Sequence, residues 1–491
     1  MGNDPNYYEI LNLPRDASVD EIRRAHRTLV RELHPDSNPD NPDATEKFIV
    51  VQEAFEVLSD TTRRKKYDST LPPDIPILRV NSLYSRSTLL KIKEPQLVFT
   101  LLELSAPAEA ESKPAPPLNV CMLLDHSTSM KGARMDMVKS TAIEIIRQIR
   151  PQDILSIISF GDHAETILPA GARTDMRQIE HMIQMMQASG GTEIFSGLSA
   201  GFQEVRRNSS SRYINHMLLL TDGRTYGDEE KCIALAQEAA GLGIGISGLG
   251  IGTEWNDTFL DKMAAITGGD TTYIERSSDI KRFLEEKFRR LSKIYADNLQ
   301  FKFTKDDGVK INYAFRVHPE ASPLAEEDGG FRLGNIPINE PMKILFEMMV
   351  SAIAEDAEDV TLAEGRLIMD IPTSSEPRLS RRITLSRPIS LSAKQEQSPT
   401  EIINALSQVT LYRMQEKAQV DVDKGFIDEA VTRLQNLATH LLAQGENELA
   451  RTVLIEAQNV SRTRAISAEG GKRIKYGTRS LLLPEGTEGR L

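Results

Sequence analysis

The sequence predicts a multidomain chain with an all-α N-terminal domain, a doubly wound, Rossmann-like α/β domain inserted in a β-sandwich, and a C-terminal helical bundle. Three observations predict it. The first 70 residues show helical periodicity, and short apolar runs alternate with amphipathic helices between residues 118 and 276. Three helical stretches separated by glycines follow residue 398. A length of 491 residues is also enough for three or four domains.

The first long helix of the N-terminal domain is predicted to begin at Val19. Ser18 and Glu21 form a capping box, in which each side chain can bond the backbone N–H of the other. One face of the helix is apolar, and the remaining surface is basic. The apolar stripe consists of Ile22, Ala25, Leu29 and Leu33, and the basic surface consists of Arg23, Arg24, Arg27 and Arg31.

A second helix is predicted after Asn41-Pro42, because asparagine caps helices and proline favours the first helical turn. Its apolar stripe consists of Phe48, Val51, Phe55 and Leu58. Two antiparallel helices would then hold the loop His34-Pro35-Asp36 at one end of the domain. Proline and aspartate also favour ordinary turns, which is the alternative interpretation of this tripeptide.

The N-terminal residues resemble the J domain of DnaJ-type co-chaperones. The resemblance rests on the basic helix and on four segments, 7–11, His34-Pro35-Asp36, 54–60 and 63–68. It implies that the tripeptide triggers ATP hydrolysis in a DnaK-type partner, and that the arginine face docks on an acidic surface of that partner. His26 stands where the family usually has tyrosine. We expect it on the exposed side of the helix, where it would affect partner affinity more than the fold.

The α/β domain is predicted from apolar runs and intervening helices. Strands are expected at 120–124, 154–160, 217–221 and 244–251, and helices at 133–149, 196–207, 229–242, 258–266 and 280–291. Asp125 and Asp222 each follow a strand, so both should lie at one edge of the sheet. Ligands of open parallel sheets bind at that edge, where the strand order reverses, and the first strand is the usual reversal point.

The polar residues at this edge indicate a site for a hard divalent cation. They offer oxygen alone, and there are too few carboxylates to enclose an ion. We expect magnesium, or alternatively manganese or calcium, with a coordination position left open for an Asp or Glu of another protein. The predicted metal ligands are Asp125, Ser127, Ser129, Thr192 and Asp222. The alternative is that these side chains only cap helices.

This pattern resembles the metal-ion-dependent adhesion site of the von Willebrand factor type A domain, which reads Asp-x-Ser-x-Ser, then Thr, then Asp. All five positions are present. His126, between two of them, should point away from its neighbours and is not expected to be a ligand. No catalytic base, second carboxylate pair or phosphate-binding loop accompanies the site, so hydrolysis has little support and the chain is not expected to be an enzyme.

Alternating patterns at 77–104 and 299–391 predict antiparallel strands on both sides of the α/β domain. Neither flank has enough strands for a stable core, so we expect one sandwich built from both. Lys305-Asp306-Asp307-Gly308 is predicted to be a hairpin turn with Gly308 at positive φ. Residues 106–117 read as a connector. The expected domains are 1–72, 73–117 (linker and first sandwich strands), 118–294, 295–393, 396–465 and a tail, 466–491.

The C-terminal domain is predicted to begin with Ser398 as a cap, Pro399 in the first turn and Glu401 at the third position. Gly425 and Gly445 separate two further helices. A three-helix bundle is favoured over a true repeat array, because only one internal echo is visible. Within the tail, residues 475–478 and 481–483 are candidates for an added strand, and a mobile tail is the alternative.

Composition limits the classes of partner. The net charge is −12, from 71 acidic and 59 basic residues, which argues against nucleic acid as a partner. The only cysteines, Cys121 and Cys232, offer no disulfide framework, so a cytoplasmic location is expected. No secretion segment and no run of roughly 20 apolar residues is visible, so membrane insertion is not expected.

These features together predict a J-domain co-chaperone or adaptor. The J domain would stimulate a DnaK-type ATPase, and the metal site would recruit a protein client or complex. The main alternative is a metal-dependent scaffold of a multiprotein assembly, with an AAA-type ATPase as one candidate member, in which the J domain has a minor role. A metal-dependent hydrolase ranks third because a base is missing.

Overall fold

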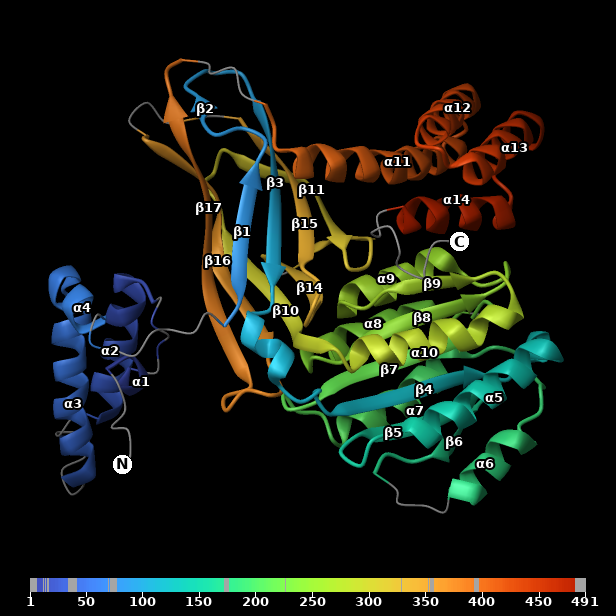
Figure 1. Ribbon diagram of the computed structural model, residues 1–491, viewed down its shortest axis with the longest axis horizontal. Helices are drawn as coiled ribbons and strands as arrows, with labels where there is room; N and C mark the ends of the chain where they lie inside the picture. Colours follow the sequence, from blue (N-terminus) through green and yellow to red (C-terminus); the bar gives the residue numbers. More distant parts are fainter. Residues whose placement is uncertain are drawn as a thin grey trace.

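A computed structural model shows how the predicted domains are arranged (Figure 1). It describes residues 7–11, 13, 15, 17–33, 42–68, 70, 77–171, 176–225, 227–327, 329–351, 353, 357–392 and 397–481. The N-terminal helical domain lies beside the six-stranded sheet of a β-sandwich. The α/β domain lies at the other end of the sandwich, and the C-terminal helices lie above the α/β domain in the view of Figure 1.

The N-terminal domain consists of α1 (Tyr7–Ile10), α2 (Val19–Leu33), α3 (Pro42–Leu58) and α4 (Thr61–Asp68). The predicted capping box is confirmed, because the Ser18 N–H donates to Glu21 Oε2 at 2.7 Å and the Glu21 N–H donates to Ser18 Oγ at 3.2 Å. The core of this domain is a small set of buried apolar residues: Tyr8, Leu11, Ala17, Ile22, Val51, Ala54 and Leu58.

The prediction that His26 lies on the exposed side of α2 is wrong. Its ring stacks on the ring of Phe55 in α3, with centroids 3.9 Å apart and planes 13° apart. The Nε2 atom is buried without a hydrogen-bond partner among the described residues. A helical pattern assigns positions to a face but does not reveal how far an aromatic ring turns into the adjacent helix. His26 is therefore part of the packing between α2 and α3.

The α/β domain is built on a six-stranded sheet with the order β6-β5-β4-β7-β8-β9. All neighbouring strands pair in parallel except β6, which is antiparallel to β5. The chain runs from the central first strand, β4, to one side and later returns to the other, so the predicted reversal at the first strand is confirmed. The strands are β4 (Leu118–Asp125), β5 (Ile154–Phe160), β6 (Ala164–Leu168), β7 (Ile214–Thr221), β8 (Gly245–Ile251) and β9 (Thr271–Ile274).

Helices cover both faces of this sheet, and each face has its own buried cluster. The helices are α5 (Ala133–Gln148), α6 (Met176–Met185), α7 (Ile194–Arg206), α8 (Glu229–Gly241), α9 (Asp257–Thr267) and α10 (Ile280–Leu291). Because both faces are covered, β4 and β7 are buried along their whole length, which explains the run of consecutive apolar residues in each strand.

The β-sandwich combines strands from before and after the α/β domain. Its five-stranded sheet has the order β1-β3-β15-β11-β12, and its six-stranded sheet has the order β13-β14-β10-β16-β17-β2. The longer strands are β1 (Arg79–Tyr84), β3 (Gln96–Ser105), β10 (Ile294–Thr304), β11 (Val309–His318), β14 (Gly330–Pro337), β15 (Met342–Val350), β16 (Asp359–Asp370) and β17 (Arg378–Ser390). The short strands are β2 (Leu89–Leu90), β12 (Ser322–Pro323) and β13 (Glu326–Glu327). One apolar core joins the two sheets, so the α/β domain is an insertion in the sandwich.

The predicted hairpin at residues 305–308 is wrong. β10 and β11, on either side of it, belong to different sheets, so this segment crosses from one sheet to the other. The Asp306 N–H donates to the Thr361 carbonyl at 3.1 Å, and the Thr361 N–H donates to Asp306 Oδ2 at 2.8 Å. Gly308 is not among the residues with positive φ. Two adjacent strands with turn residues between them do not reveal which sheet each strand joins.

The C-terminal domain contains α11 (Thr400–Asp423), α12 (Ile427–Ala443), α13 (Asn447–Thr463) and α14 (Ala468–Ser480). Two expectations for this region are wrong. Ser398 does not cap α11, because its Oγ donates to the Ser85 carbonyl at 3.1 Å and Pro399 is the cap residue. Residues 468–480 form a helix rather than part of a tail or an added strand. Contacts with the α/β domain stabilise this glycine-containing helix.

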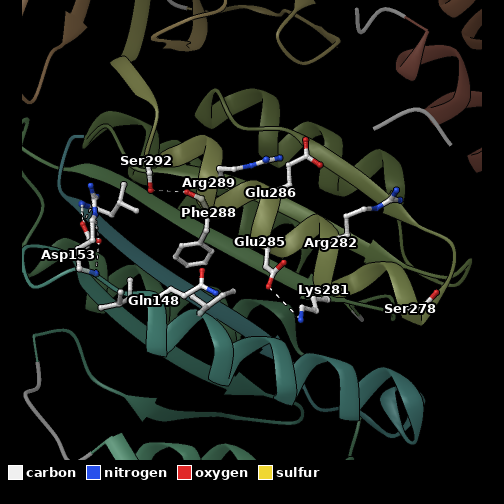
Figure 2. A pocket seen from close by; sticks show the side chains of 14 residues that line it. Gln148, Asp153, Ser278, Lys281, Arg282, Glu285, Glu286, Phe288, Arg289 and Ser292 are labelled. Atoms are coloured by element: carbon white, nitrogen blue, oxygen red, sulfur yellow. Dashed lines mark hydrogen bonds and ion pairs between the residues drawn. The ribbon is translucent and has the colours of Figure 1, made fainter. Parts of the chain in front are cut away.

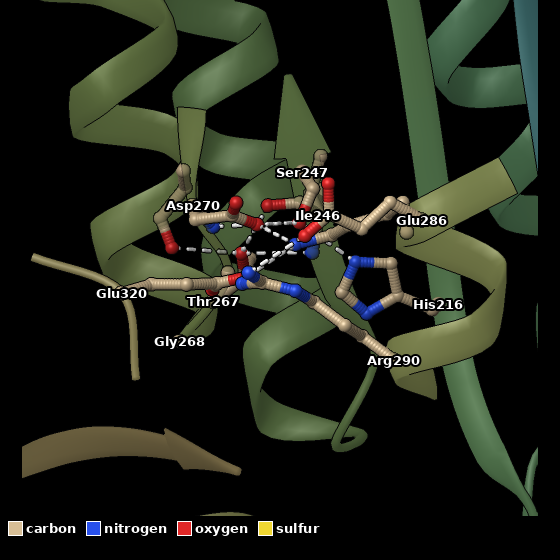
Figure 3. Close-up of polar contacts among 12 residues, drawn as sticks. His216, Ile246, Ser247, Thr267, Gly268, Asp270, Glu286, Arg290 and Glu320 are labelled. Carbon is tan, nitrogen blue, oxygen red and sulfur yellow. Dashed lines mark hydrogen bonds and ion pairs between the residues drawn. The ribbon is translucent and has the colours of Figure 1, made fainter. Parts of the chain in front are cut away.

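A polar network joins the α/β domain to the sandwich (Figure 3). The buried guanidinium of Arg316 in β11 donates to the Gly269 carbonyl at 3.0 Å and to the Leu333 carbonyl at 2.8 Å. Beside it Lys287 in α10 pairs with Asp270 and with Glu320, the latter at 3.1 Å. The Arg316–Gly269 and Lys287–Glu320 contacts cross the domain boundary, so the sandwich holds this end of the α/β domain in a defined orientation.

Candidate metal site

The candidate metal site lies at the carboxyl ends of β4 and β7, which are neighbours in the sheet. Asp125 is the last residue of β4, and Asp222 directly follows β7. Both carboxylates are buried. After β4 the chain enters a short 3-10 turn, Thr128–Met130, before α5 begins at Ala133. This sharp turn places the two serines of the motif back over the strand end.

Asp125 is held by two donors on its own edge of the sheet. The Ser127 N–H donates to Asp125 Oδ1 at 2.8 Å, and Thr221 Oγ1 donates to Asp125 Oδ2 at 2.6 Å. Burial raises the pKa of Asp125 to about 6, although the bonds from Ser127 and Thr221 favour the charged form. A positive ion beside this carboxylate would offset the cost of burying its charge.

The two serines connect the two carboxylates. Ser127 Oγ and Ser129 Oγ are 3.0 Å apart, and Ser129 Oγ donates to Asp222 Oδ1 at 2.6 Å. The second oxygen of Asp222 accepts from the guanidinium of Arg134. The structure therefore brings the predicted Asp125, Ser127 and Ser129 together with Asp222. It also places the cationic side chain of Arg134 at the site, which the sequence did not predict.

Thr192 reaches the cluster from a separate loop. A Cβ atom on Gly223 would lie only 2.6 Å from Thr192 Oγ1, so the glycine after Asp222 leaves room for the threonine hydroxyl. The loop is fixed by Asp162, whose Oδ1 accepts from the Gly191 N–H at 2.7 Å, and by Gly190 at φ +75°. All five predicted ligand residues thus gather at one edge of the sheet.

The sequence reasoning missed three residues that shape the site: Thr221, Gly223 and Arg134. Thr221 and Gly223 flank the predicted Asp222, so their position next to a carboxylate at a strand end was a signal that could have identified them. Arg134 lies in the first turn of α5 and gave no signal. His126 lies between two of the predicted ligands. Its half-buried ring packs against Gly161, and burial lowers its pKa.

The donor set fits a hard divalent cation. Two carboxylates, two serine hydroxyls and a threonine hydroxyl supply oxygen alone, which suits magnesium, manganese or calcium. Gly223 leaves the space that the threonine hydroxyl needs. Among the described residues no group of three or more His, Cys, Asp or Glu side chains could hold a metal. Any ion bound here would therefore depend on hydroxyls and water, as well as on the two carboxylates.

His34, Pro35 and Asp36 lie outside the described residues. The basic surface of α2 is described, and its four arginines, Arg23, Arg24, Arg27 and Arg31, are all exposed. They project from the helix face opposite the buried Ile22. This surface is open to an acidic partner in the arrangement that the structure shows.

A groove of about 650 Å³ between α5 and α10 is separate from the metal site (Figure 2). It extends toward Leu118 and Asp153, near the amino-terminal ends of β4 and β5. Its charged walls are largely paired, since Lys281 bridges Glu144 at 2.8 Å and Glu285 at 4.0 Å. The groove gathers no set of reactive side chains comparable to the cluster at Asp125.

The fold and the site define the class of the central part, an α/β domain with an oxygen-lined edge inserted in a β-sandwich. Comparison with protein-family models assigns this part to a family, because residues 119–286 match the von Willebrand factor type A domain. Residues 6–68 match the DnaJ domain. Residues 400–484 match the family described as "Sll0103-like, C-terminal alpha-helical domain". The chain therefore contains a J domain and a von Willebrand factor type A domain, as the sequence predicted.

Two similar proteins match stretches of this chain that differ greatly in length. A Synechocystis protein named "Uncharacterized protein sll0103" is 29% identical over 335 residues, which is 66% of this chain and 78% of that protein. The chaperone protein DnaJ of Caldicellulosiruptor saccharolyticus is 53% identical over 68 residues, 14% of this chain and 18% of DnaJ. The chain thus shares only the J domain with DnaJ.

Two solved structures share the larger part of the fold. A von Willebrand factor type A protein from Catenulispora acidiphila has a TM-score of 0.64 and 14% identity, covering 82% of this chain and 97% of that one. The ArnB paralog VWA2 from Sulfolobus acidocaldarius has a TM-score of 0.51 and 14% identity, covering 82% and 98%. At this identity the likeness concerns the fold alone.

Proposed function

We propose that the chain is a co-chaperone adaptor. Its J domain recruits and stimulates a DnaK-type ATPase, and its von Willebrand factor type A domain binds a protein client or complex through a metal ion. The observation that carries the proposal is that one chain joins a J domain with an exposed arginine face to a cluster of five oxygen-bearing residues at a sheet edge. No catalytic step is assigned to this chain, and a cytoplasmic location fits its role.

In this proposal Asp125, Ser127, Ser129, Thr192 and Asp222 hold magnesium, directly or through water. The ion supplies a Lewis-acidic contact point for an Asp or Glu side chain of the client. No helix among the described residues is long and apolar enough to cross a bilayer.

The J-domain part is tested with His34→Gln. We expect the full-length chain to raise the ATP turnover of a DnaK-type chaperone, and the variant to leave turnover at its basal rate with an unchanged melting temperature. His181→Gln, on α6 of the other domain, is the control and should stimulate like the wild type. If His34→Gln stimulated ATP turnover as strongly as the wild type, the proposed co-chaperone function would be wrong.

The metal part is tested with Asp125→Ala, which removes the carboxylate that Ser127 and Thr221 orient. We expect the captured client to be lost in pull-downs from cell extract, as it should be when wild type is treated with a chelator. Asp359→Ala changes an exposed carboxylate in the sandwich and should leave capture intact. Identical captured proteins with and without metal would show that this site does not recruit the client.

A second function, a scaffold in a multiprotein assembly, is favoured by the extent of the similarity to the Synechocystis protein. That alignment covers 335 residues, against 68 for DnaJ, so most of the chain belongs to the part shared with a protein other than DnaJ. The scaffold function predicts stable, stoichiometric co-purification with partners, such as an AAA-type ATPase, that persists in the His34→Gln variant.

A further inference from the structure

The candidate metal site already contains a cation of the protein itself. Arg134 pairs with Asp222 Oδ2, while Ser129 Oγ donates to the other oxygen of the same carboxylate. The guanidinium also approaches the Ser129 carbonyl at 3.4 Å. The Asp222 side chain has no exposed surface, whereas 36% of the Arg134 side chain is exposed. Arg134 therefore approaches the buried carboxylate from the solvent side.

The loop after β8 leaves space for this guanidinium. Gly252 has φ +69°, and a Cβ atom on it would lie 2.9 Å from Arg134 Nη2. A side chain at this position would be strained and would also crowd the arginine. The same loop is tied to the loop after β7 by Arg224, whose Nε donates to the Glu254 carbonyl at 2.9 Å. The position of Arg134 over Asp222 is thus defined by contacts on both sides.

Magnesium and Arg134 compete for the same negative charge. An ion coordinated by Asp222 would lie within a few ångströms of the guanidinium, and like charges at such distances repel strongly where water is partly excluded. The arginine also lowers the negative potential that attracts the ion. In the absence of metal, the same pair stabilises a buried carboxylate that would otherwise lack a counter-charge.

We propose that Arg134 is an internal competitor that sets the metal affinity of this site. In the metal-free protein it neutralises Asp222, and metal binding requires it to move away from that carboxylate. The arginine keeps the empty site stable and lowers its affinity for divalent cations. This inference rests on the proposed metal site but concerns a residue outside the ligand set.

The test measures magnesium binding to the full-length protein by calorimetry, and melting temperature in chelator and in magnesium. Arg134→Gln removes the charge and keeps a polar side chain. We expect the variant to bind magnesium about tenfold more tightly than the wild type. In chelator it should melt at a lower temperature than the wild type, so magnesium should raise its melting temperature by a larger amount.

Arg147→Gln is the matched control, because Arg147 lies on the same helix and pairs with Glu180 at an exposed position. It should bind magnesium like the wild type. Arg134→Lys keeps the positive charge and should retain weak binding, which separates charge from side-chain size.

The outcomes separate the competitor role of Arg134 from the proposed metal site. If only Arg134→Gln binds magnesium, the competitor role stands and the metal-dependent function of the wild type is lost. If the wild type binds and Arg134→Gln binds equally or more weakly, the competitor role is wrong and the metal site stands. If neither protein binds magnesium, manganese or calcium, both proposals are wrong.

Discussion

Asp297 shows how a single carboxylate can make stability depend on pH. It lies directly opposite Asp370 in the pairing of β10 with β16, close to the junction with the α/β domain. Burial, and then the charge of Asp370, raise the pKa of Asp297 to about 7, although the Asn298 N–H favours the charged form. At neutral pH this residue is therefore poised between its two forms.

The sign of the effect follows from linkage. A carboxyl group whose pKa is higher in the folded than in the unfolded protein stabilises the fold fully below the unfolded value of about 3.9, and this stabilisation is lost as pH rises to about 7. Asp297→Asn should raise the melting temperature relative to wild type at pH 8 and leave it unchanged near pH 3.5. Asp359→Asn, at an exposed position, should show no pH-dependent difference.

Residue patterns predicted which side chains gather at the sheet edge better than they predicted packing. Asp125 and Asp222 could be placed because each follows a run of apolar residues in a strand, and parallel strands end at one edge of the sheet. Arg134 could not be found, because an arginine in a first helical turn is ordinary and only the fold brings it to Asp222. His26 was misplaced for a similar reason, since its contact with Phe55 depends on the relative rotation of two helices.

At the scale of elements, the sequence predicted the long central strands of the α/β domain and missed its short outer strands and the last helix, α14. β6 and β9 are short, and β6 is partly exposed, so their sequences have little apolar alternation. α14 contains Gly470, Gly471 and several cations, which disfavour an isolated helix. It exists because the α/β domain supplies partners for those cations.

α14 docks on the α/β domain through buried ion pairs and aromatic packing. Arg479 donates to both oxygens of Asp261, at 2.9 and 2.7 Å, and Lys475 pairs with the same carboxylate at 2.7 Å. Burial alone would raise the pKa of Asp261, but Arg479 and Lys475 lower it to about 2. Tyr476 packs beside Trp255, with ring centroids 5.8 Å apart, and belongs to the α/β core.

Arg479→Gln should therefore release α14 from the α/β domain. Removing one member of a buried ion pair typically costs about 3–5 kcal/mol, and Lys475 would offset part of this cost. We expect faster amide hydrogen exchange in α14 and a lower melting temperature. Arg473→Gln on the same helix removes a pair with Glu275 at a position where 39% of the arginine is exposed, and its effect should be below about 1 kcal/mol. Equal hydrogen exchange of α14 in the two variants would contradict the role of the Arg479–Asp261 pair in docking this helix.

At the scale of the whole molecule, the J domain contacts the sandwich through the amino-terminal end of α2. Glu21 Oε1 accepts from Arg366 at 2.8 Å, and its second oxygen lies 3.9 Å from Arg382. Arg366 and Arg382 belong to β16 and β17 of the six-stranded sheet, beside which the J domain lies in Figure 1. The exposed arginines of α2 do not take part in this contact. Docking on the sandwich therefore leaves the four arginines of α2 exposed.

Reversing one charge should separate the J domain from the sandwich without unfolding either. Arg366→Glu places a negative charge against Glu21, while the capping box between Ser18 and Glu21 stays intact. The two like charges should repel, so we expect a larger radius of gyration in X-ray solution scattering. Because a partly exposed ion pair contributes at most about 1 kcal/mol, the melting temperature should change little. Lys310→Glu, an exposed change on the other sheet, should leave the radius unchanged.

The same variant separates docking from activity. Since the α2 arginines are already exposed in the docked arrangement, release of the J domain should leave stimulation of a DnaK-type ATPase within about twofold of the wild type. Stimulation and radius of gyration are to be measured on the same preparation. A large gain in stimulation would mean that contact with the sandwich restrains the J domain, and that the position of α2 beside Arg366 is inhibitory rather than permissive.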